Sequence, residues 1–168
     1  FAAEPAAEFT EQKTIGVVCN IADEASVNTA WQRIDAELPQ VVGLANVAGI
    51  ACPTPLLELT VDEFDKVMGV NARGTMLMMQ YGARRMIQAG VGRIANFSSI
   101  TAYDGGGTFS KIAYAAGKAA VIGLTRGGAR ELGQYGITTN CICPGPIDTE
   151  IMGGKLTDER KASMSSNI

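Results

Sequence analysis

The chain has 168 residues, of which 46% are apolar and 18% are charged. This is one domain's length, and the composition excludes an intrinsically disordered protein, which combines low hydrophobicity with high charge. The absence of histidine excludes a histidine base and a zinc site with His ligands. The scattered lysines and arginines at net charge −3 argue against a nucleic-acid partner, and the apolar stretches are too short to span a membrane.

Short apolar runs alternate with helical patterns along the chain. The runs predict strands over residues 14–19, 41–45, 94–97 and 137–143. Apolar residues at helical spacing from Val27 to Leu38 predict the first helix, with Asp23 as its N-cap. The capping box from Thr60 to Glu63 opens a long helix that ends near Gly90, and a further helix is predicted over residues 112–132.

Short apolar strands that alternate with helices are typical of a parallel sheet covered on both faces. The predicted fold class is therefore α/β with a doubly wound parallel sheet, since four strands are too few for an eight-stranded barrel. Ligands of such sheets bind beyond the carboxyl ends of the strands. Asn20, residues 46–49, Ser99 and residues 144–149 each follow a predicted strand, so we expect a functional site there.

The four cysteines form no C-x-x-C pair. We interpret Cys19, Cys52, Cys141 and Cys143 as small buried apolar residues of a protein in a reducing cytoplasm, and we expect no metal. Pairing or metal ligation is the alternative.

Tyr114 and Lys118 are four residues apart on a predicted helix, which puts both side chains on one face. A phenol titrates near ~10, and a nearby ammonium lowers its pKa. The pair could therefore act as an acid/base group in a chain without histidine. On spacing alone, an ordinary amphipathic helix is the alternative.

Two further polar residues are candidates. Ser99 lies between a strand and the loop that leads to the Tyr114 helix, where its hydroxyl could bind a substrate oxygen or only cap a turn. Asn71 lies within the long helix, where asparagine is unfavourable without a specific partner, although a surface position would also explain it.

Together these motifs form an ordered set, namely Asn46-Val47-Ala48-Gly49, Asn71, Ser98-Ser99, Tyr114-x-x-x-Lys118 and Pro144-Gly145-Pro146-Ile147-Asp148-Thr149. From about residue 13 to 168 the chain resembles the short-chain dehydrogenases/reductases, in their bacterial 3-oxoacyl-ACP-reductase-like branch. The resemblance implies a Rossmann-like fold and an NAD or NADP cofactor. It also implies an enzyme that interconverts a small-molecule carbonyl and a secondary alcohol by hydride transfer.

The resemblance assigns roles to four residues. Tyr114 would be the general acid/base, and Lys118 would lower the pKa of Tyr114 and bind the nicotinamide ribose. Ser99 would hold the substrate oxygen, and Asn71 would anchor a water that connects Lys118 to solvent. The Ser99–Tyr114 spacing is two residues longer than is common in the family, so the loop at residues 105–107 would have to absorb the difference, with Ser98 as the alternative hydroxyl.

The resemblance also assigns the cofactor contacts. Asn20 stands where the family usually has an aspartate that receives the adenine amino group, and its side-chain oxygen could accept the same bond. The cofactor-binding residues would be Asn20, Ile21, Asn46, Ala48, Gly49, Tyr114, Lys118, Pro144, Gly145, Ile147 and Thr149.

The Gly-rich turn of the T-G-x-x-x-G-x-G type, which holds the pyrophosphate in this family, does not occur in the sequence. We therefore expect residues 1–168 to be one partial domain that lacks the N-terminal βαβ phosphate-binding unit and the C-terminal helix and strand. A piece of a longer gene product is the favoured interpretation, and a chain that folds alone with a reduced sheet is the alternative.

The missing turn also motivates a second functional hypothesis, a catalytically silent interaction module that does not bind dinucleotide. For assembly, the resemblance implies a homodimer or homotetramer through the long helices that carry Asn71 and Tyr114. The methionine row of Met76, Met79 and Met86 suits either such an interface or the core.

Overall fold

The computed structural model describes residues 13–107, 110–147 and 157–159. Its elements in chain order are α1 (Glu24–Glu37), β1 (Gly43–Asn46), α2 (Val61–Met68), the π-helical turn η2 (Gly69–Gly74), α3 (Thr75–Ala89), β2 (Gly92–Phe97), α4 (Thr101–Asp104), α5 (Ile112–Leu132), the 3-10 turn η3 (Gly133–Tyr135) and β3 (Ile137–Ile142).

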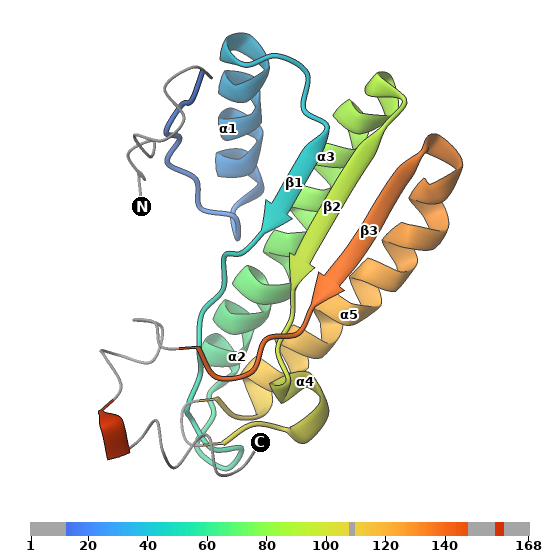
Figure 1. Ribbon diagram of the computed structural model, residues 1–168. Coiled ribbons are helices and arrows are strands. Elements are labelled where there is room, and N and C mark those ends of the chain that lie inside the picture. The colour runs from blue at the N-terminus through green and yellow to red at the C-terminus, as the bar shows by residue number, and fades with distance from the viewer. Residues whose placement is uncertain (1–12, 108–109, 148–156, 160–168) are drawn as a thin grey trace.

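The three strands form one parallel sheet in the order β1-β2-β3 (Figure 1). Gly43 pairs with Arg93 at the start of the first ladder, and Gly92 pairs with Ile137 at the start of the second. Helices connect each strand to the next, as parallel pairing requires. The predicted α/β class with a parallel sheet is confirmed.

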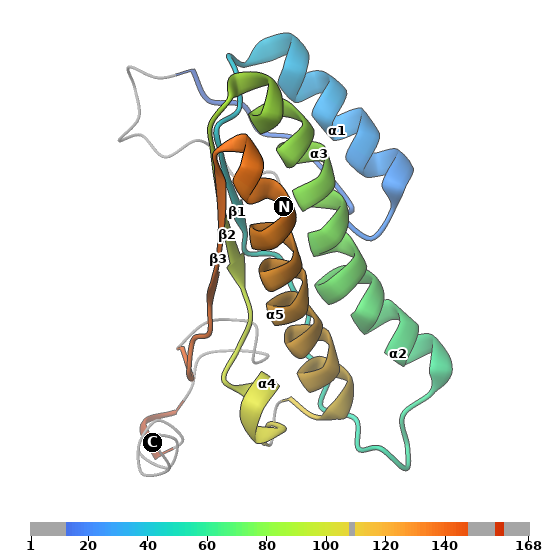
Figure 2. The same cartoon turned by 90° about the vertical axis from the view of Figure 1, so that its right-hand side faces the viewer.

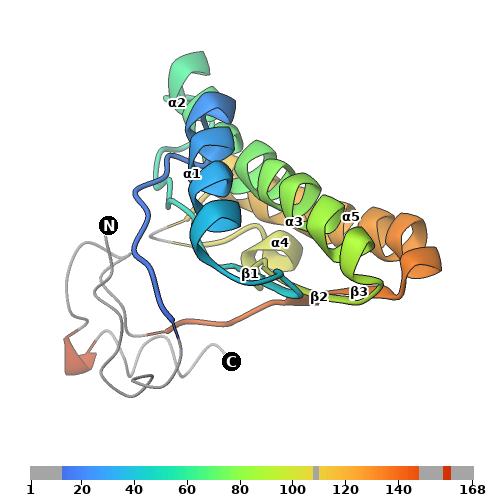
Figure 3. The ribbon, with the colours of Figure 1, turned by 90° about the horizontal axis from the view of Figure 1, so that it is seen from above.

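Helices α3 and α5 lie against one face of the sheet, and α1 packs beside α3 on the same side (Figures 2 and 3). Within the described residues no helix covers the other face. The strands accordingly alternate: Ile94 and Asn96 of β2 are buried under the helices, while Arg93 before them is exposed and Ala95 between them is partly exposed. We predicted helices on both faces of the sheet. In the described residues, helices cover one face only.

The strand predicted over residues 14–19 is not formed. This segment is extended, but it pairs with no strand of the described chain, because β1 bonds only to β2. Side chains hold its backbone instead, since Arg33 Nη1 donates to the Gly16 carbonyl at 3.1 Å. An apolar run needs a neighbouring ladder to become a strand.

Local sequence signals place most helix ends correctly. Helix α5 has the predicted limits, and Asp23 caps α1 by accepting from the Ala25 amide. Thr60 caps α2 by accepting from the Glu63 amide, but the Glu63 carboxylate does not return the bond. It accepts from Thr54 Oγ1 at 2.6 Å. The capping box is therefore half formed, and Glu63 instead holds the loop that follows β1.

The methionine row belongs mainly to the core. Met86 is fully buried and Met79 is 7% exposed, and both pack with Ile94 and Ile137 between α3 and the sheet. Met76 is partly buried at the groove between α3 and α5. No helix of the described residues is long and apolar enough to cross a membrane.

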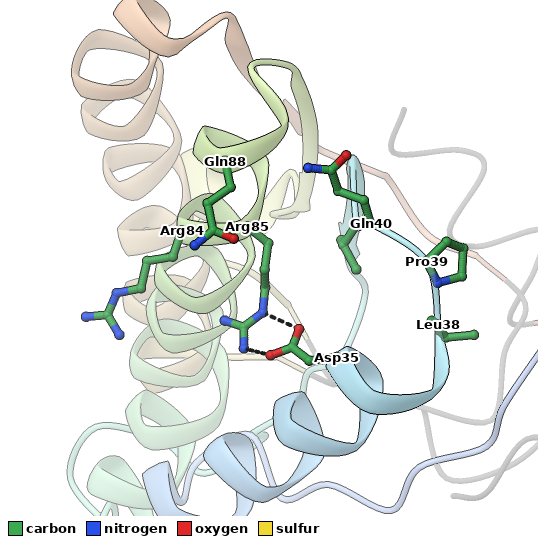
Figure 4. Close-up of a pocket in the computed structure, with 8 residues that line it drawn as sticks. Asp35, Leu38, Pro39, Gln40, Arg84, Arg85 and Gln88 are labelled. Atoms are coloured by element: carbon green, nitrogen blue, oxygen red, sulfur yellow. Dashed lines mark hydrogen bonds and ion pairs between the residues drawn. The ribbon is translucent and has the colours of Figure 1, made fainter.

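A second cluster joins α1 to α3. Trp31 packs with Val27 and Leu77, and the Arg85 guanidinium lies over its ring, 4.7 Å from the centroid. Arg85 also binds both carboxylate oxygens of Asp35 beside a cavity of about 440 Å³ (Figure 4). This cavity is next to the residues that precede β1, so it lies at the edge of the sheet opposite to the predicted site.

Candidate active site

Tyr114 and Ser99 come together beyond the carboxyl end of β2. The Ser99 hydroxyl is close enough to the Tyr114 phenol to lower the pKa of that phenol, and Ser99 Oγ lies 3.1 Å from Thr101 Oγ1 at the start of α4. Tyr114 enters from the first turn of α5 and is partly buried beside Cys52 and Ala113. The structure thus joins the two hydroxyls that the sequence proposed as partners.

The loop between them absorbs the long spacing. Helix α4 forms one turn, and Gly105 and Gly106 then reverse the chain with φ of 80° and 90°. The Asp104 carboxylate accepts from the Gly106 amide at 2.8 Å, and the Gly107 amide donates to the Ser110 carbonyl at 2.9 Å. Left-handed backbone at two successive residues is readily available only to glycine. The glycine-rich stretch is therefore what returns the chain to α5.

Ser98, the alternative hydroxyl, points elsewhere. It is 4% exposed, and its Oγ donates to the Lys118 carbonyl at 2.7 Å. That bond connects α5 to the end of β2 and directs the Ser98 hydroxyl away from Tyr114. Of the two neighbouring serines, only Ser99 reaches Tyr114.

Lys118 lies one helical turn after Tyr114 and is only 5% exposed. Its Nζ donates to the Phe97 carbonyl at 2.8 Å and lies over the Tyr114 ring, 5.7 Å from the centroid. An ammonium has three N–H donors, and the bond to Phe97 uses one of them within the described residues. Lys118 therefore retains capacity to bind further oxygen atoms.

Asn71 is fully buried in the π-helical turn η2, which divides the predicted long helix. Its amide clamps one peptide group, because Oδ1 accepts from the Ile50 amide and Nδ2 donates to the Ile50 carbonyl, both at 2.9 Å. The specific partner expected for a mid-helix asparagine is thus the backbone of the segment that follows β1.

Two glycines permit the close packing around Asn71. A Cβ at Gly49 would lie 3.1 Å from Lys118 Nζ and 3.2 Å from Asn71 Oδ1, and a Cβ at Gly117 would lie 3.0 Å from Asn71 Cβ. These distances are shorter than ordinary carbon contacts. Gly117 therefore lets η2 approach α5 closely.

Asn46 turns into the core. Its Nδ2 donates to Asn96 Oδ1 at 2.8 Å, and Asn96 Nδ2 donates to Thr125 Oγ1 at 3.0 Å. This buried network links β1, β2 and α5, so the Asn46 side chain does not line the cleft. Ala48 is exposed and Gly49 is partly exposed beside Lys118, which leaves these two residues at the expected cofactor side.

The segment after β3 is fixed to the segment after β2. The Ile100 amide donates to the Pro144 carbonyl at 3.0 Å, and Gly145 lies in contact range of Ile100. Gly145 and Ile147 are exposed, Ile147 by 58%. The predicted contact Thr149 lies outside the described residues.

Asn20 and Ile21 are the residues that the resemblance assigns to the adenine end of the cofactor. Asn20 is exposed, and its Oδ1 accepts from the Ala22 amide at 3.1 Å in a local turn. A carbonyl oxygen has a second lone pair, so the side chain can still accept a bond from a ligand. Ile21 packs against η2, where a Cβ at Gly74 would lie 2.8 Å from its Cδ1.

The electrostatics differ from the expectation that Lys118 lowers the pKa of Tyr114. Burial raises the pKa of Tyr114 above its usual value, and the hydrogen bond from Ser99 opposes this only in part. Burial also lowers the pKa of Lys118, with the nearby Cys141 acting in the opposite direction. The ammonium lies over the ring face and bonds to Phe97, and it is not among the causes that shift the pKa of Tyr114.

The family model described as short chain dehydrogenase matches residues 1–160. This chain belongs to the short-chain dehydrogenase family. An uncharacterized short-chain type dehydrogenase/reductase of Sinorhizobium fredii is 37% identical over 92% of the chain. The 3-oxoacyl-[acyl-carrier-protein] reductase FabG of Aquifex aeolicus is 33% identical over 93% of the chain.

A solved structure of this short-chain dehydrogenase type has the same fold. The gluconate 5-dehydrogenase of Burkholderia cenocepacia, in complex with NADP and tartrate, superposes with a TM-score of 0.75 at 33% identity. The match covers 80% of this chain and 52% of that one. The chain spans 61% and 62% of the lengths of the Sinorhizobium and Aquifex relatives.

Sequence reasoning missed the part played by Asn96 and Thr125 in this short-chain dehydrogenase. Both are buried and connect Asn46 to α5. An asparagine within an apolar strand is itself a signal, because buried polar side chains need partners. The identity of those partners is a long-range property, since Asn46 and Asn96 are 50 residues apart.

Proposed function

We propose that the chain carries the proton-transfer site of an NAD(P)-dependent oxidoreductase that interconverts a carbonyl and a secondary alcohol. The observation that carries this proposal is the contact of the Tyr114 phenol with the Ser99 hydroxyl, next to the buried ammonium of Lys118. Family membership and the NADP complex of the Burkholderia relative support it.

Tyr114 acts as the acid/base group. A phenol is protonated at neutral pH and burial raises the pKa of Tyr114 further, so Tyr114 can donate a proton to the oxygen of a carbonyl substrate. Ser99 donates a second hydrogen bond to the same oxygen and holds it beside the phenol. In the reverse direction, Tyr114 first gives up its proton toward solvent, and its phenolate then takes up the proton of the alcohol, whose oxygen Ser99 holds in place.

The residues around Lys118 fit a nicotinamide ribose. The two remaining N–H donors of Lys118 suit vicinal hydroxyl groups, and the close approach of Gly49 leaves the ammonium uncovered by a side chain. Ala48, Gly145 and Ile147 border the same edge of the sheet and Asn20 lies at its far side. When bound, NAD or NADP supplies or accepts the hydride.

Asn71 acts as a positioning residue. Its clamp on Ile50 fixes the segment that includes Gly49, and therefore the space in front of Lys118. The amide retains one lone pair and one proton, which suffice to bind a water between Lys118 and solvent. Such a water would return protons to the site after each reaction.

The experiment is a hydride-transfer assay of the chain with NADH and NADPH against a panel of carbonyl compounds. Tyr114→Phe should reduce the rate by about a hundredfold or more, because the proton donor is removed. Tyr135→Phe, in the turn η3 that follows the far end of α5, is the matched control and should retain the rate. A Tyr114→Phe variant with the full rate would overturn the assignment.

Fluorescence titration with NADH and NADPH tests the alternative of a silent interaction module. Binding of either dinucleotide, weakened when Lys118 is replaced by methionine, supports the oxidoreductase. If neither binds and no substrate is turned over, the chain alone is a silent module and the proposed function fails for it.

For assembly, the observations favour a homodimer through α3 and α5. A groove of about 490 Å³ runs between these helices, and its apolar lining includes Met76, Ile87 and Leu124. Arg84 of α3 and Glu131 of α5 also line it. In a two-fold pair, each surface meets its own copy, so Arg84 of one chain can face Glu131 of the other.

A further inference from the structure

Two thiols lie close together at the carboxyl end of β3. Cys141 is the second-last residue of β3 and pairs with Asn96, and Cys143 directly follows the strand. Side chains two residues apart in an extended chain point to the same face. Thr139 on that face is buried against Gly128 of α5, so Cys141 and Cys143 lie on the helix-covered side.

The contacts of Cys141 agree with this placement. Its thiol interacts with the Thr125 side chain, the Ser98 backbone and the Cys143 thiol, and its charge state is linked to that of Lys118. Both cysteines are free and partly exposed, as is Cys19, which corrects the expectation that all four cysteines are buried; only Cys52 is. The pair therefore consists of two neighbouring, partly exposed thiols beside the buried ammonium of the candidate site.

The Cα separation of the two cysteines is compatible with a disulfide. Two residues of extended chain span about 6.6 Å between Cα atoms, within the range of about 4.4–6.8 Å found for disulfides. The Cβ atoms must approach to about 3.5–4.5 Å, so closure requires the chain to bend between Cys141 and Cys143. Cys143 lies outside the ladder, and the neighbouring Ile142 and Pro144 carbonyls, which accept from the Ser98 and Ile100 amides, limit that bend.

We propose that Cys141 and Cys143 form an oxidisable dithiol that closes to a disulfide when a hydroperoxide reaches it. The proposal rests on the placement of the two thiols and does not depend on the proposed function. Cys19 is far from both in the fold, before α1, and Cys52 is 2% exposed, so neither offers a second dithiol.

The reaction has two steps. The Cys143 thiolate attacks the peroxide O–O bond, takes one oxygen as a sulfenic acid and releases the alcohol, or water from hydrogen peroxide. The Cys141 sulfur then displaces the hydroxyl as water and forms the S–S bond. Two thiols lose two protons and two electrons, and one hydroperoxide is reduced. Burial raises the pKa of Cys141, which favours Cys143 as the first thiol to react.

The experiment uses the intact chain and hydrogen peroxide, followed by alkylation of free thiols, tryptic digestion and mass spectrometry. Residues 131–155 form one tryptic peptide that contains both cysteines and no other, while Cys19 lies in the peptide 14–33. We expect peptide 131–155 to become two hydrogens lighter and resistant to alkylation, while the Cys19 peptide is still alkylated. Dithiothreitol should restore two alkylation sites.

Single variants test the order of the steps. Cys141→Ser should leave a sulfenic acid on Cys143 that dimedone traps, whereas Cys143→Ser should yield no internal disulfide and little trapped adduct. Cys19→Ser is the matched control and should not change the result. The proposal is overturned if oxidised wild-type peptide is still alkylated twice, if the cysteines link two chains instead, or if Cys143→Ser is oxidised as wild type is.

Discussion

Lys118 carries a charge in a place where only 5% of the side chain is exposed. Burial disfavours the charged form and lowers the pKa of the ammonium below its usual 10.5. One hydrogen bond to the Phe97 carbonyl offsets part of this cost. The residue is therefore a local source of instability that a binding function would explain.

Lys118→Met should stabilise the fold at neutral pH by about 1 kcal/mol or more, because removing a desolvated charge outweighs one lost hydrogen bond. Between its folded and unfolded pKa values, Lys118 holds more protons in the unfolded chain. Wild-type stability therefore rises with pH in that window, and the advantage of the variant shrinks toward pH 10.5.

Urea unfolding from neutral to alkaline pH measures this difference. Lys66→Met, on the exposed side of α2, is the control and should leave stability nearly unchanged. A Lys118→Met chain that is less stable at neutral pH would show that the ammonium contributes more through its contacts than burial costs it.

At the scale of elements, the connection from α4 to α5 decides whether Ser99 and Tyr114 meet. Its reversal depends on Gly105 and Gly106, which both have positive φ. A Cβ at Gly105 would meet nothing, whereas a Cβ at Gly106 would lie 2.2 Å from the Ser110 carbonyl oxygen. Gly107 has neither constraint.

Three alanine variants should therefore form a graded series. Gly107→Ala should change stability by less than about 0.5 kcal/mol, and Gly105→Ala should cost about 1–2 kcal/mol for left-handed backbone. Gly106→Ala should cost more, because the loop must also move away from Ser110. Urea unfolding gives the stabilities, and the hydride-transfer rate shows whether Ser99 still reaches Tyr114. Equal effects at all three positions would contradict the described loop.

At the scale of the whole molecule, the helices of the described residues cover one face of the sheet (Figure 2). A groove lies between α3 and α5. Ile87 in this groove is 38% exposed. An apolar groove with a positive side chain on one helix and a negative one on the other is complementary to itself under two-fold symmetry. This is the physical basis for the proposed dimer.

Arg84→Glu should weaken the dimer by about tenfold or more, because it places like charges against each other at the interface. Combining it with Glu131→Arg should restore association. Sedimentation over a range of concentrations measures both. Arg126→Glu, exposed on α5 outside the groove, is the control. A chain that is monomeric at every concentration, or a double variant that stays dissociated, would refute this interface.

Much of the fold could be predicted because the signals are local. The cap at Asp23, the cap at Thr60 and the limits of α5 follow from neighbouring residues. The prediction of a strand at residues 14–19 was wrong because strand formation is not local: an apolar run becomes a strand only beside another strand. The π-helical turn at Asn71 was not predicted either, because Asn71 bonds to Ile50, which lies in a segment distant in the sequence.

The sequence by itself determined the alternation of strands and helices, and therefore the parallel sheet and the edge at which polar residues gather. Only the tertiary structure decided which serine lies near Tyr114, that Met79 and Met86 fill the core, and that burial raises the pKa of Tyr114. The reason is physical: partners and desolvation depend on what long-range packing brings against a side chain, and the spacing of residues along the chain does not specify it.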